Sequence, residues 1–374
     1  MKEVNMGWAI RGIHINVANF MFVCLYIHIG RGIYYGSFRL YKVWATGIVM
    51  LLLVMLTAFT GYVLPWGQMS YWAAQVITTM VTAIPVVGKD IAVWVWGGYA
   101  VGNVTLKRVF SIHFILPFII LCLFMLHMSF LHETGSGNPL GVDTDCCLVR
   151  FHSFYTVKDL VGVLGSCVLV SYFVFFHPYA FVDGQSFVEC DYMETPSSIH
   201  PEWYFLFAYA ILRSVPNKAG GIVLMLGSIL VLFIIPELWV GKFESLAMYF
   251  FCQWLFWVWV TNFFILSIIG SKPVEEPYII SGVYCTVFYF IFFPLVGVIQ
   301  LYEDFLMTLP PCGPAETEFE KAFERFYDSL FQEWEGFEED ENELCRYEAD
   351  LMDKDEVDAM LAQDPVCWGQ INKK

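Results

Sequence analysis

The chain has 374 residues, of which 58% are hydrophobic and 18% aromatic, and its mean hydropathy is +0.59. This composition excludes an ordinary soluble domain, because apolar runs long enough to cross a hydrocarbon core of about 30 Å recur along the chain. Residues 313–374 carry 19 acidic and 6 basic side chains and so hold −13 of the net charge of −16. Such an acidic tail attracts neither nucleic acid nor anionic lipid.

The apolar runs predict an all-α, polytopic membrane protein with seven transmembrane helices and a helical soluble tail. The expected spans are residues 7–35, 44–66, 108–131, 160–180, 220–240, 248–270 and 279–302. We expect three parts: a histidine-bearing part with three spans (1–135), a second part with four spans (136–305), and an acidic amphipathic extension (306–374).

Basic residues cluster in the loops that follow the first and third spans. Arg31, Arg39 and Lys42 lie in the first of these loops, and Arg150 and Lys158 flank the second. By the positive-inside rule both loops lie on the electron-negative side of the membrane. With seven alternating spans the acidic extension emerges on that side too, which is the matrix side in a mitochondrion.

Four histidines lie inside two of the expected spans. His14 and His28 are 14 residues apart, and so are His113 and His127. On an α-helix this spacing is about four turns, or about 21 Å, so both imidazoles of a pair point nearly the same way. Two such helices can hold two haems with bis-histidine ligation, one near each face, which favours electron transfer. A helix–helix hydrogen bond or a proton relay is the alternative for a single histidine.

Glycines and arginines accompany these histidines. Gly47 and Gly61 are also 14 residues apart and leave room for a porphyrin edge, although ordinary helix packing explains small residues as well. Arg11, Arg108 and Arg31 lie three to five residues from a histidine, where a guanidinium can bind a haem propionate. Arginines that extend from helix ends toward water are the alternative.

The segment Pro201-Glu202-Trp203-Tyr204 introduces a carboxylate beside an aromatic helix. Glu202 is a candidate base for a quinol, because partial burial raises the pKa of a carboxylic acid toward neutral pH. Tyr204 and Tyr209 are candidates for lining a flat apolar pocket. A first-turn carboxylate favoured by the helix dipole is the alternative.

Polar residues gather at the opposite end of the spans. His132 and Ser136 follow the third span, and Lys158 and Asp159 begin the fourth. A hydroxyl, an imidazole and a carboxylate at one membrane edge suit the binding and protonation of a quinone. Taken alone, this pattern is weak.

The acidic extension has its own periodicity. Large apolar side chains recur every three or four residues and predict one amphipathic helix: Phe319, Phe323, Phe326, Leu330, Trp334 and Phe337. A similar pattern over 344–361 predicts a second. The extension is either a docking module for a partner subunit or a solvated appendage.

With these motifs the chain resembles cytochrome b of the quinol–cytochrome c oxidoreductases (bc1 complex, complex III). The resemblance covers about residues 4–305 in one register. It rests on both histidine pairs, on PEWY and on stretches such as TAFTGYVLPWGQMSYWAAQVIT and FYTVKDLVG.

The resemblance implies a role for each motif. His14 and His113 would ligate a low-potential haem b, and His28 and His127 a high-potential haem b. It assigns the quinol-oxidation site to Pro201, Glu202, Tyr204 and Tyr209 with Phe59, Tyr62, Ala73 and Ile77. It assigns the quinone-reduction site to His132, Ser136 and Asp159 with Lys158.

The implied function is electron bifurcation coupled to proton translocation. One electron of ubiquinol passes to a Rieske iron–sulfur protein and cytochrome c1, and the other crosses both haems to ubiquinone. The implied setting is a homodimeric complex with core and accessory subunits and membrane lipids. The mitochondrial inner membrane is the expected location, with a bacterial plasma membrane as the alternative.

Three departures from the family pattern lead to further expectations. The family's opening span has no counterpart here, so we expect a separate small chain to supply it and complete the bundle. The extension 306–374 has no counterpart either. Ala73-Ala74 stands where the family usually has a glycine after Trp72, which predicts reduced sensitivity to strobilurin-type inhibitors.

Three other functions remain open from the residues alone. A dihaem membrane anchor of a dehydrogenase explains the histidines but not PEWY. A transporter that uses the histidines as a proton relay would contain no haem. A non-catalytic remnant would have no need of all four ligands.

Overall fold

The structure is a computed structural model, and it describes residues 3–308, except 143 and 145–147, together with Arg325. The chain divides into two compact units, Met1–Thr308 and Leu309–Lys374. The two helices predicted for the acidic extension lie outside the described residues, apart from Arg325. All other described residues belong to the first unit.

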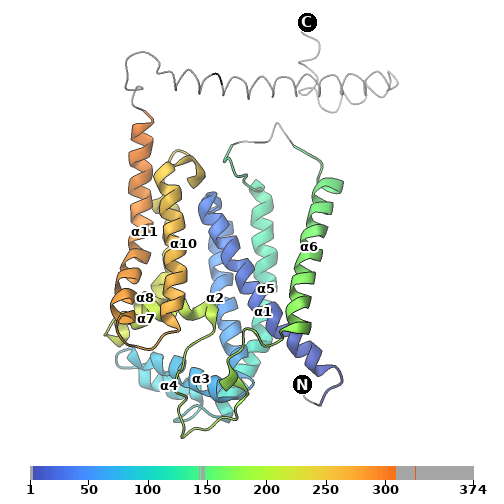
Figure 1. The fold of residues 1–374 in the computed structure, drawn as a ribbon, viewed down its shortest axis with the longest axis vertical. Coiled ribbons are helices and arrows are strands. Elements are labelled where there is room, and N and C mark those ends of the chain that lie inside the picture. The colour runs from blue at the N-terminus through green and yellow to red at the C-terminus, as the bar shows by residue number, and fades with distance from the viewer. Residues whose placement is uncertain (1–2, 143, 145–147, 309–324, 326–374) are drawn as a thin grey trace. The chain divides into compact units, whose positions relative to one another are not determined.

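Seven helices of the first unit are long and apolar enough to cross a membrane. They are α1 (Gly7–Tyr34), α2 (Tyr41–Val63), α5 (Asn103–Thr134), α6 (Phe151–Phe176), α8 with η5 and α9 (Lys218–Leu238), α10 (Phe250–Gly270) and α11 (Tyr278–Leu306). Figure 1 shows most of them side by side. The all-α, seven-span prediction is confirmed. The first turn of α6 is irregular, because His152 and Ser153 have non-helical backbone angles.

Shorter helices form the connections on one side of the spans. The connection between α2 and α5 contains α3 (Gln68–Met80), η2 (Val81–Ala83) and α4 (Gly88–Trp96). In Figure 1, α3 and α4 lie across the lower ends of the spans. The other short elements are η1 (Ser37–Arg39), η3 (Gly184–Phe187), η4 (Trp203–Phe205), α7 (Leu206–Arg213) and η6 (Leu246–Met248). Within the span Lys218–Leu238, α8 ends at Leu230 and is continued by η5 (Val231–Ile234) and α9 (Ile235–Leu238).

Local sequence explains several helix boundaries. Gly36 ends the turn after α1 with a φ of 77°, and a Cβ there would lie 2.2 Å from the Glu244 carbonyl oxygen, so that only glycine fits. Asn217 caps α8, because its side chain accepts a hydrogen bond from the Gly220 backbone. Several hydroxyls inside the spans bond to their own helix, as where the Thr57 hydroxyl donates to the Leu53 carbonyl.

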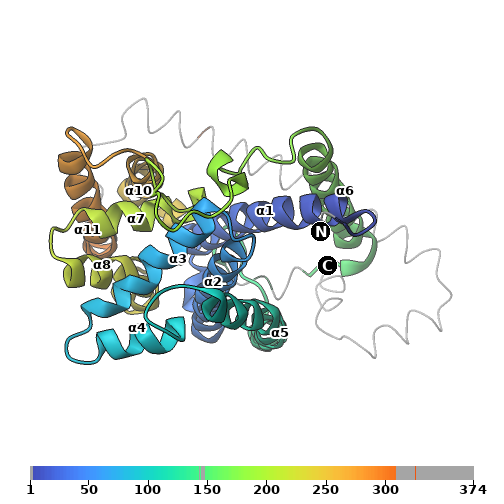
Figure 2. The same cartoon turned by 90° about the horizontal axis from the view of Figure 1, so that it is seen from below.

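The spans form two groups in Figure 2: α8, α10 and α11 lie on one side, and α1, α2, α5 and α6 on the other. The largest cluster of buried apolar side chains joins α2 to α7, α8, α10 and α11. In contrast, only 6% of the apolar window is buried in α5 and likewise in α6. α5 packs mainly on α2, and α6 mainly on α1. The group of α1, α2, α5 and α6, which we call the histidine-bearing group, is therefore less buried than the group of α8, α10 and α11.

Candidate functional site

The four histidines of the two spans face one another across the gap between α1 and α5. The ring centres of His14 and His113 are 6.2 Å apart, with planes inclined by 77°. A metal–imidazole bond is about 2 Å long, so a metal held between two imidazoles separates their ring centres by about 6 Å. His28 and His127 are close enough to interact electrostatically. The spacing of His14 and His113 therefore suits a metal held between them, and the pairing of His28 with His127 stays a prediction.

Hydrogen bonds from α2 orient the two imidazoles of α5. The Nδ1 of His113 is 2.9 Å from the carbonyl oxygen of Thr57, which can only accept. The Nδ1 of His127 is 3.0 Å from the hydroxyl of Thr46, whose hydrogen is directed at the carbonyl of Lys42 at 2.8 Å or of Val43 at 2.9 Å. Both imidazoles thus donate from Nδ1 and keep the Nε2 lone pair for a metal.

Gly47 and Gly61 let α5 approach α2. A Cβ at Gly61 would lie 2.5 Å from Cε1 of His113, and one at Gly47 would lie 3.4 Å from Cε1 of His127. Sequence reasoning assigned these glycines to the porphyrin edge. The structure adds another reason for Gly61, which makes room for the His113 ring, whereas a Cβ at Gly47 would make an ordinary contact.

Three arginines lie near the ends of the histidine-bearing spans. Arg31 donates to the hydroxyl of Ser37 at 2.9 Å, Arg108 donates to the carbonyl of Trp94, and Arg11 lies 5.5 Å from the centre of the Phe187 ring. Within the described residues none of the three is paired with a carboxylate. Their charges remain available for an anionic group.

Glu202 lies at the start of the short helix η4, on the same side as α3 and α4. Burial raises the pKa of Glu202 to about 7; the nearby Tyr62 hydroxyl opposes this rise, and the charge of Asp183 adds to it. Asp183 is itself 3.8 Å from Nε2 of His200. A carboxylic acid with a pKa near neutral pH can both accept and release a proton under working conditions.

Two family models match the chain. Residues 1–135 match the model described as cytochrome b/b6/petB, and residues 189–290 match the model of the C-terminal part, cytochrome b(C-terminal)/b6/petD. A solved structure described as hyperthermophilic respiratory Complex III is 31% identical and superposes with a TM-score of 0.75, with 81% of each chain covered. The chain belongs to the cytochrome b family. Membership implies that this multi-pass membrane protein binds haem b, and the four histidines fit that group.

The two tyrosines predicted to line the quinol pocket, Tyr204 and Tyr209, make different contacts. Tyr204 is buried and stacks on Phe22 of α1 at 4.0 Å, and its burial raises the pKa of its hydroxyl. The Tyr209 hydroxyl donates to the carbonyl of Ile199 at 3.3 Å, which ties α7 to the segment before Pro201. Tyr204 thus packs into the helix bundle, and Tyr209 braces the chain around Glu202.

The other predicted quinol-site residues belong to α2 and α3. Phe59 packs against a buried cluster that includes Val63 and Ala74. Ala73 and Ile77 are half-buried on α3. These positions surround the junction of α2 and α3, where Tyr62 meets Glu202.

The structure does not bring the predicted quinone-reduction residues together. His132, Ser136, Lys158 and Asp159 are all exposed. Within the described residues, no hydrogen bond or ion pair joins the end of α5 to the start of α6. The physical reason is that α6 packs on α1 rather than on α5, so these ends stand apart in Figure 1.

Sequence reasoning missed the residues of α1 that hold the PEWY segment. The Asn19 Oδ1 accepts a hydrogen bond from the Trp203 indole at 2.7 Å, and the Tyr26 hydroxyl donates to the Tyr204 carbonyl at 2.5 Å. Together with Phe22 they recur every three or four residues along α1. Polar Asn19 inside an apolar span was the signal that could have revealed them.

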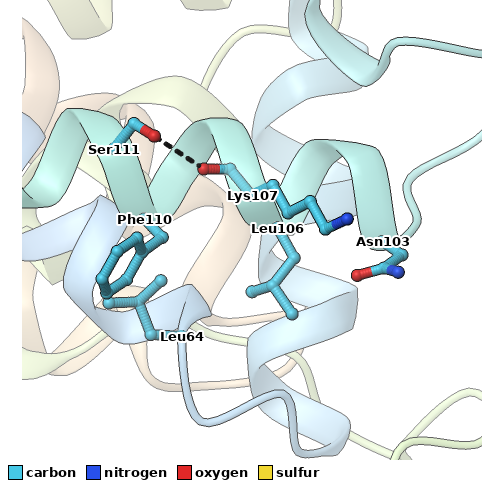
Figure 3. Close-up of a pocket in the computed structure, with 6 residues that line it drawn as sticks. All are labelled: Leu64, Asn103, Leu106, Lys107, Phe110 and Ser111. Atoms are coloured by element: carbon cyan, nitrogen blue, oxygen red, sulfur yellow. Dashed lines mark hydrogen bonds between the residues drawn. The ribbon is translucent and has the colours of Figure 1, made fainter.

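A hollow at the start of α5 lies apart from these sites. It is lined by Leu64, Asn103, Leu106, Lys107, Phe110 and Ser111, as Figure 3 shows. None of these is a predicted site residue.

Proposed function

We propose that this chain is the redox subunit of a bc1-type complex. Ubiquinol would be oxidised near Glu202 at the positive face and ubiquinone reduced at the negative face, with two b haems, once bound, carrying one electron between them. The observation that carries the proposal is the separation of 6.2 Å between the ring centres of His14 and His113, each on a separate span. A hydrogen-bonded histidine pair without a metal would bring the rings closer together.

The histidines and arginines would hold the haems. Bound haem supplies one-electron carriers between the two faces. His14 with His113, and His28 with His127, provide the axial ligands, and both α5 imidazoles are held by α2 with Nε2 free. Arg11 and Arg108 near one haem, and Arg31 near the other, would bind propionates.

Glu202 would take the proton of the quinol. Because its pKa is about 7, a substantial fraction of the carboxyl is ionised at neutral pH and can accept a proton from the quinol hydroxyl. Tyr62 orients the carboxylate, and the half-exposed Asp183 offers the proton a way toward water. Protons are thus released on the positive side.

At the negative face His132, Ser136, Lys158 and Asp159 would bind and protonate the quinone. Their chemistry suits this reaction: an imidazole and a carboxylate to deliver protons, a hydroxyl to hold a carbonyl, and a cation to stabilise negative charge. Since these residues are exposed and apart in the isolated chain, the site requires a further component.

We infer that a transmembrane helix of another polypeptide completes the histidine-bearing group. His14 and His28 are exposed although they lie inside membrane spans, and α5 and α6 bury only 6% of their apolar windows. Polar groups in a membrane interior are normally covered by neighbouring helices. A peptide inventory of the purified complex tests this inference, and finding no small apolar chain would contradict it.

The further partners follow from the proposed reaction. A Rieske iron–sulfur protein and cytochrome c1 would accept the first electron, within a dimeric assembly that contains core and accessory subunits. We propose the mitochondrial inner membrane as the location. The likeness to a respiratory Complex III structure supports a multi-subunit respiratory assembly.

A potentiometric optical titration of the purified complex in the haem α-band region tests the function. Two b-type transitions with separate midpoints are expected, and quinone should oxidise the higher one in an antimycin-sensitive way. A single transition would contradict two bis-histidine sites, and no transition would favour a transporter or a remnant.

A further inference from the structure

Two adjacent carboxylates are buried in the last turn of α11, at the end of the spans away from α3 and α4 (Figure 1). Glu303 is 7% exposed and Asp304 is 6% exposed. The dipole of a helix disfavours negative charge in its last turn, and burial disfavours it further. Among the described residues neither carboxylate belongs to an ion pair. Two buried groups of like charge therefore lack a counter-charge.

Hydrogen bonds occupy three of the four carboxylate oxygens. Oδ1 of Asp304 accepts from the Tyr249 hydroxyl at 3.0 Å, and Oδ2 accepts from the backbone N–H of Lys242 at 3.0 Å. Oε1 of Glu303 accepts from the backbone N–H of Phe251 at 3.1 Å. Oε2 of Glu303 is buried without a hydrogen-bond partner. This oxygen is thus free to bind a ligand.

The side chain of Gln300 adds a third buried polar group to the same place. It precedes Glu303 by three residues and Asp304 by four, so all three project from one face of α11. Gln300 is 0% exposed, and neither its amide oxygen nor its amide nitrogen has a partner. A Cβ at Gly241 would lie 3.0 Å from the amide carbon of Gln300 and 2.5 Å from the Tyr249 hydroxyl oxygen. The amide therefore lies beside the hydroxyl that binds Asp304. Buried amides without a partner are rare, so this one indicates a ligand.

The neighbouring side chains do not supply the counter-charge. Arg39 is exposed and donates to the carbonyls of Gly241 at 2.7 Å and Phe243 at 3.0 Å. The Cys252 thiol is directed at the carbonyl of Val296 at 3.9 Å. Arg39 instead holds the connection 239–249, whose backbone binds the end of α11.

We propose that Glu303, Asp304 and Gln300 bind a divalent cation, Ca²⁺ in preference to Mg²⁺. Carboxylate and amide oxygens are the ligands that Ca²⁺ prefers, and its charge offsets both carboxylates. Mg²⁺ gives up its water reluctantly, so an enclosed site favours Ca²⁺. Glu303 Oε2 and Gln300 Oε1 bind the ion directly, the remaining lone pairs of Asp304 contribute, and water completes the coordination. The ion fastens the connection 239–249 to the end of α11.

The first test is a calorimetric titration of the EGTA-treated full complex with Ca²⁺, in the unmodified form and in Glu303→Gln. Glutamine keeps an acceptor for Phe251 and removes the charge. We expect the unmodified complex to show one class of sites, one per chain, whose affinity falls by about tenfold or more in the variant. The acidic side chains of the extension are the same in both forms, so the difference isolates this site. The exposed Glu237→Gln is the matched control and should bind Ca²⁺ as the unmodified complex does.

Gln300→Leu is the second variant, because leucine has a similar volume and no polar atoms. Its affinity for Ca²⁺ should also fall about tenfold. In EGTA its thermal unfolding temperature should not fall, since the amide has no hydrogen-bond partner to lose. Added Ca²⁺ should raise the unfolding temperature of the unmodified complex and of Glu237→Gln, and raise it less in Glu303→Gln and Gln300→Leu.

Ca²⁺ binding that is the same in the unmodified complex and in Gln300→Leu would overturn the proposal, even if Glu303→Gln fails to assemble. A fall in the unfolding temperature of Gln300→Leu that is as large in EGTA as in Ca²⁺ would overturn it too, because the amide would then serve the fold alone. Both readouts are independent of haem and of turnover, so they stand or fall separately from the proposed function.

Discussion

The two ends of the histidine-bearing group differ in how completely this chain builds them. At the end beside α3 and α4, elements far apart in sequence meet around Glu202: Tyr62 of α2 bonds to Glu202, α1 holds Trp203, and the connection after α6 contributes Asp183. At the opposite end His132 and Asp159 are exposed on helix ends that do not meet.

The difference follows from the packing of α6. Its C-terminal half contacts α1, where Phe173 lies 5.2 Å from Phe20 and the Pro178 carbonyl accepts from Asn16 at 3.1 Å. Its N-terminal half has no such neighbour among the described residues. The chain alone therefore assembles the residues around Glu202, whereas the site that we propose at the other end needs an added surface.

The largest expected effect comes from removing a haem ligand. His113→Leu deletes the imidazole that Thr57 and Gly61 position, so one α-band transition should disappear and turnover should fall below detection. His177→Leu is the control, since that ring lies at the end of α6 and contacts only Tyr172 in the described region. Retention of both transitions in His113→Leu would break the ligand assignment.

Glu202→Gln should reduce quinol oxidation by about 100-fold or more, because a positioned base contributes on that scale. The unmodified enzyme should speed up as pH rises through about 7, since only the ionised carboxyl accepts a proton. The variant should lose this pH dependence. The exposed Glu194→Gln is the control. A profile unchanged in Glu202→Gln would exclude Glu202 as the base.

Asp159→Asn tests the proposed quinone-reduction site at the exposed end of the histidine-bearing group. Quinone-linked oxidation of the higher-potential haem should slow roughly tenfold in the assembled complex, where His132 can partly compensate as a proton donor. The thermal stability of the chain should change by less than about 0.5 kcal/mol, because the side chain is exposed. A large loss of stability would show that the negative-face site is already packed in this chain.

Asn19→Leu tests the contact that anchors the PEWY segment. Loss of the 2.7 Å hydrogen bond leaves the Trp203 indole without its acceptor, which costs about 1–3 kcal/mol. We expect a several-fold rise in KM for quinol with both haem midpoints unchanged. Asn103→Ala, at an exposed position on α5, should leave KM as it is.

The smallest effect on turnover is expected at Ala73. Ala73→Gly removes a methyl group on α3 beside the α2–α3 junction, so strobilurin-type inhibitors should bind about tenfold more tightly while uninhibited turnover stays the same. Inhibition curves for both forms measure this. Nanomolar sensitivity of the unmodified enzyme would contradict the prediction.

Much of the fold could be predicted from the local pattern of apolar residues in the sequence. The seven spans were predictable because lipid demands about 20 apolar residues and internally satisfied backbones, and every expected span corresponds to a helix. Helical periodicity also placed His14 with His28, and His113 with His127, on common faces. The helices α3 and α4 within the connection 67–107 were not predicted, because their apolar runs are too short to span.

The chemistry of the site depended on tertiary contacts. The sequence by itself determined the ligand type, the spacing and the carboxylate before Trp203, since these are properties of neighbouring positions along a helix. Only the tertiary structure decided that Thr46 and Thr57 hold the α5 imidazoles, that Asn19 holds Trp203, and that burial raises the pKa of Glu202 to about 7. Those interactions join segments separated by 56 to 184 positions, and such pairs leave no periodic trace in a single sequence.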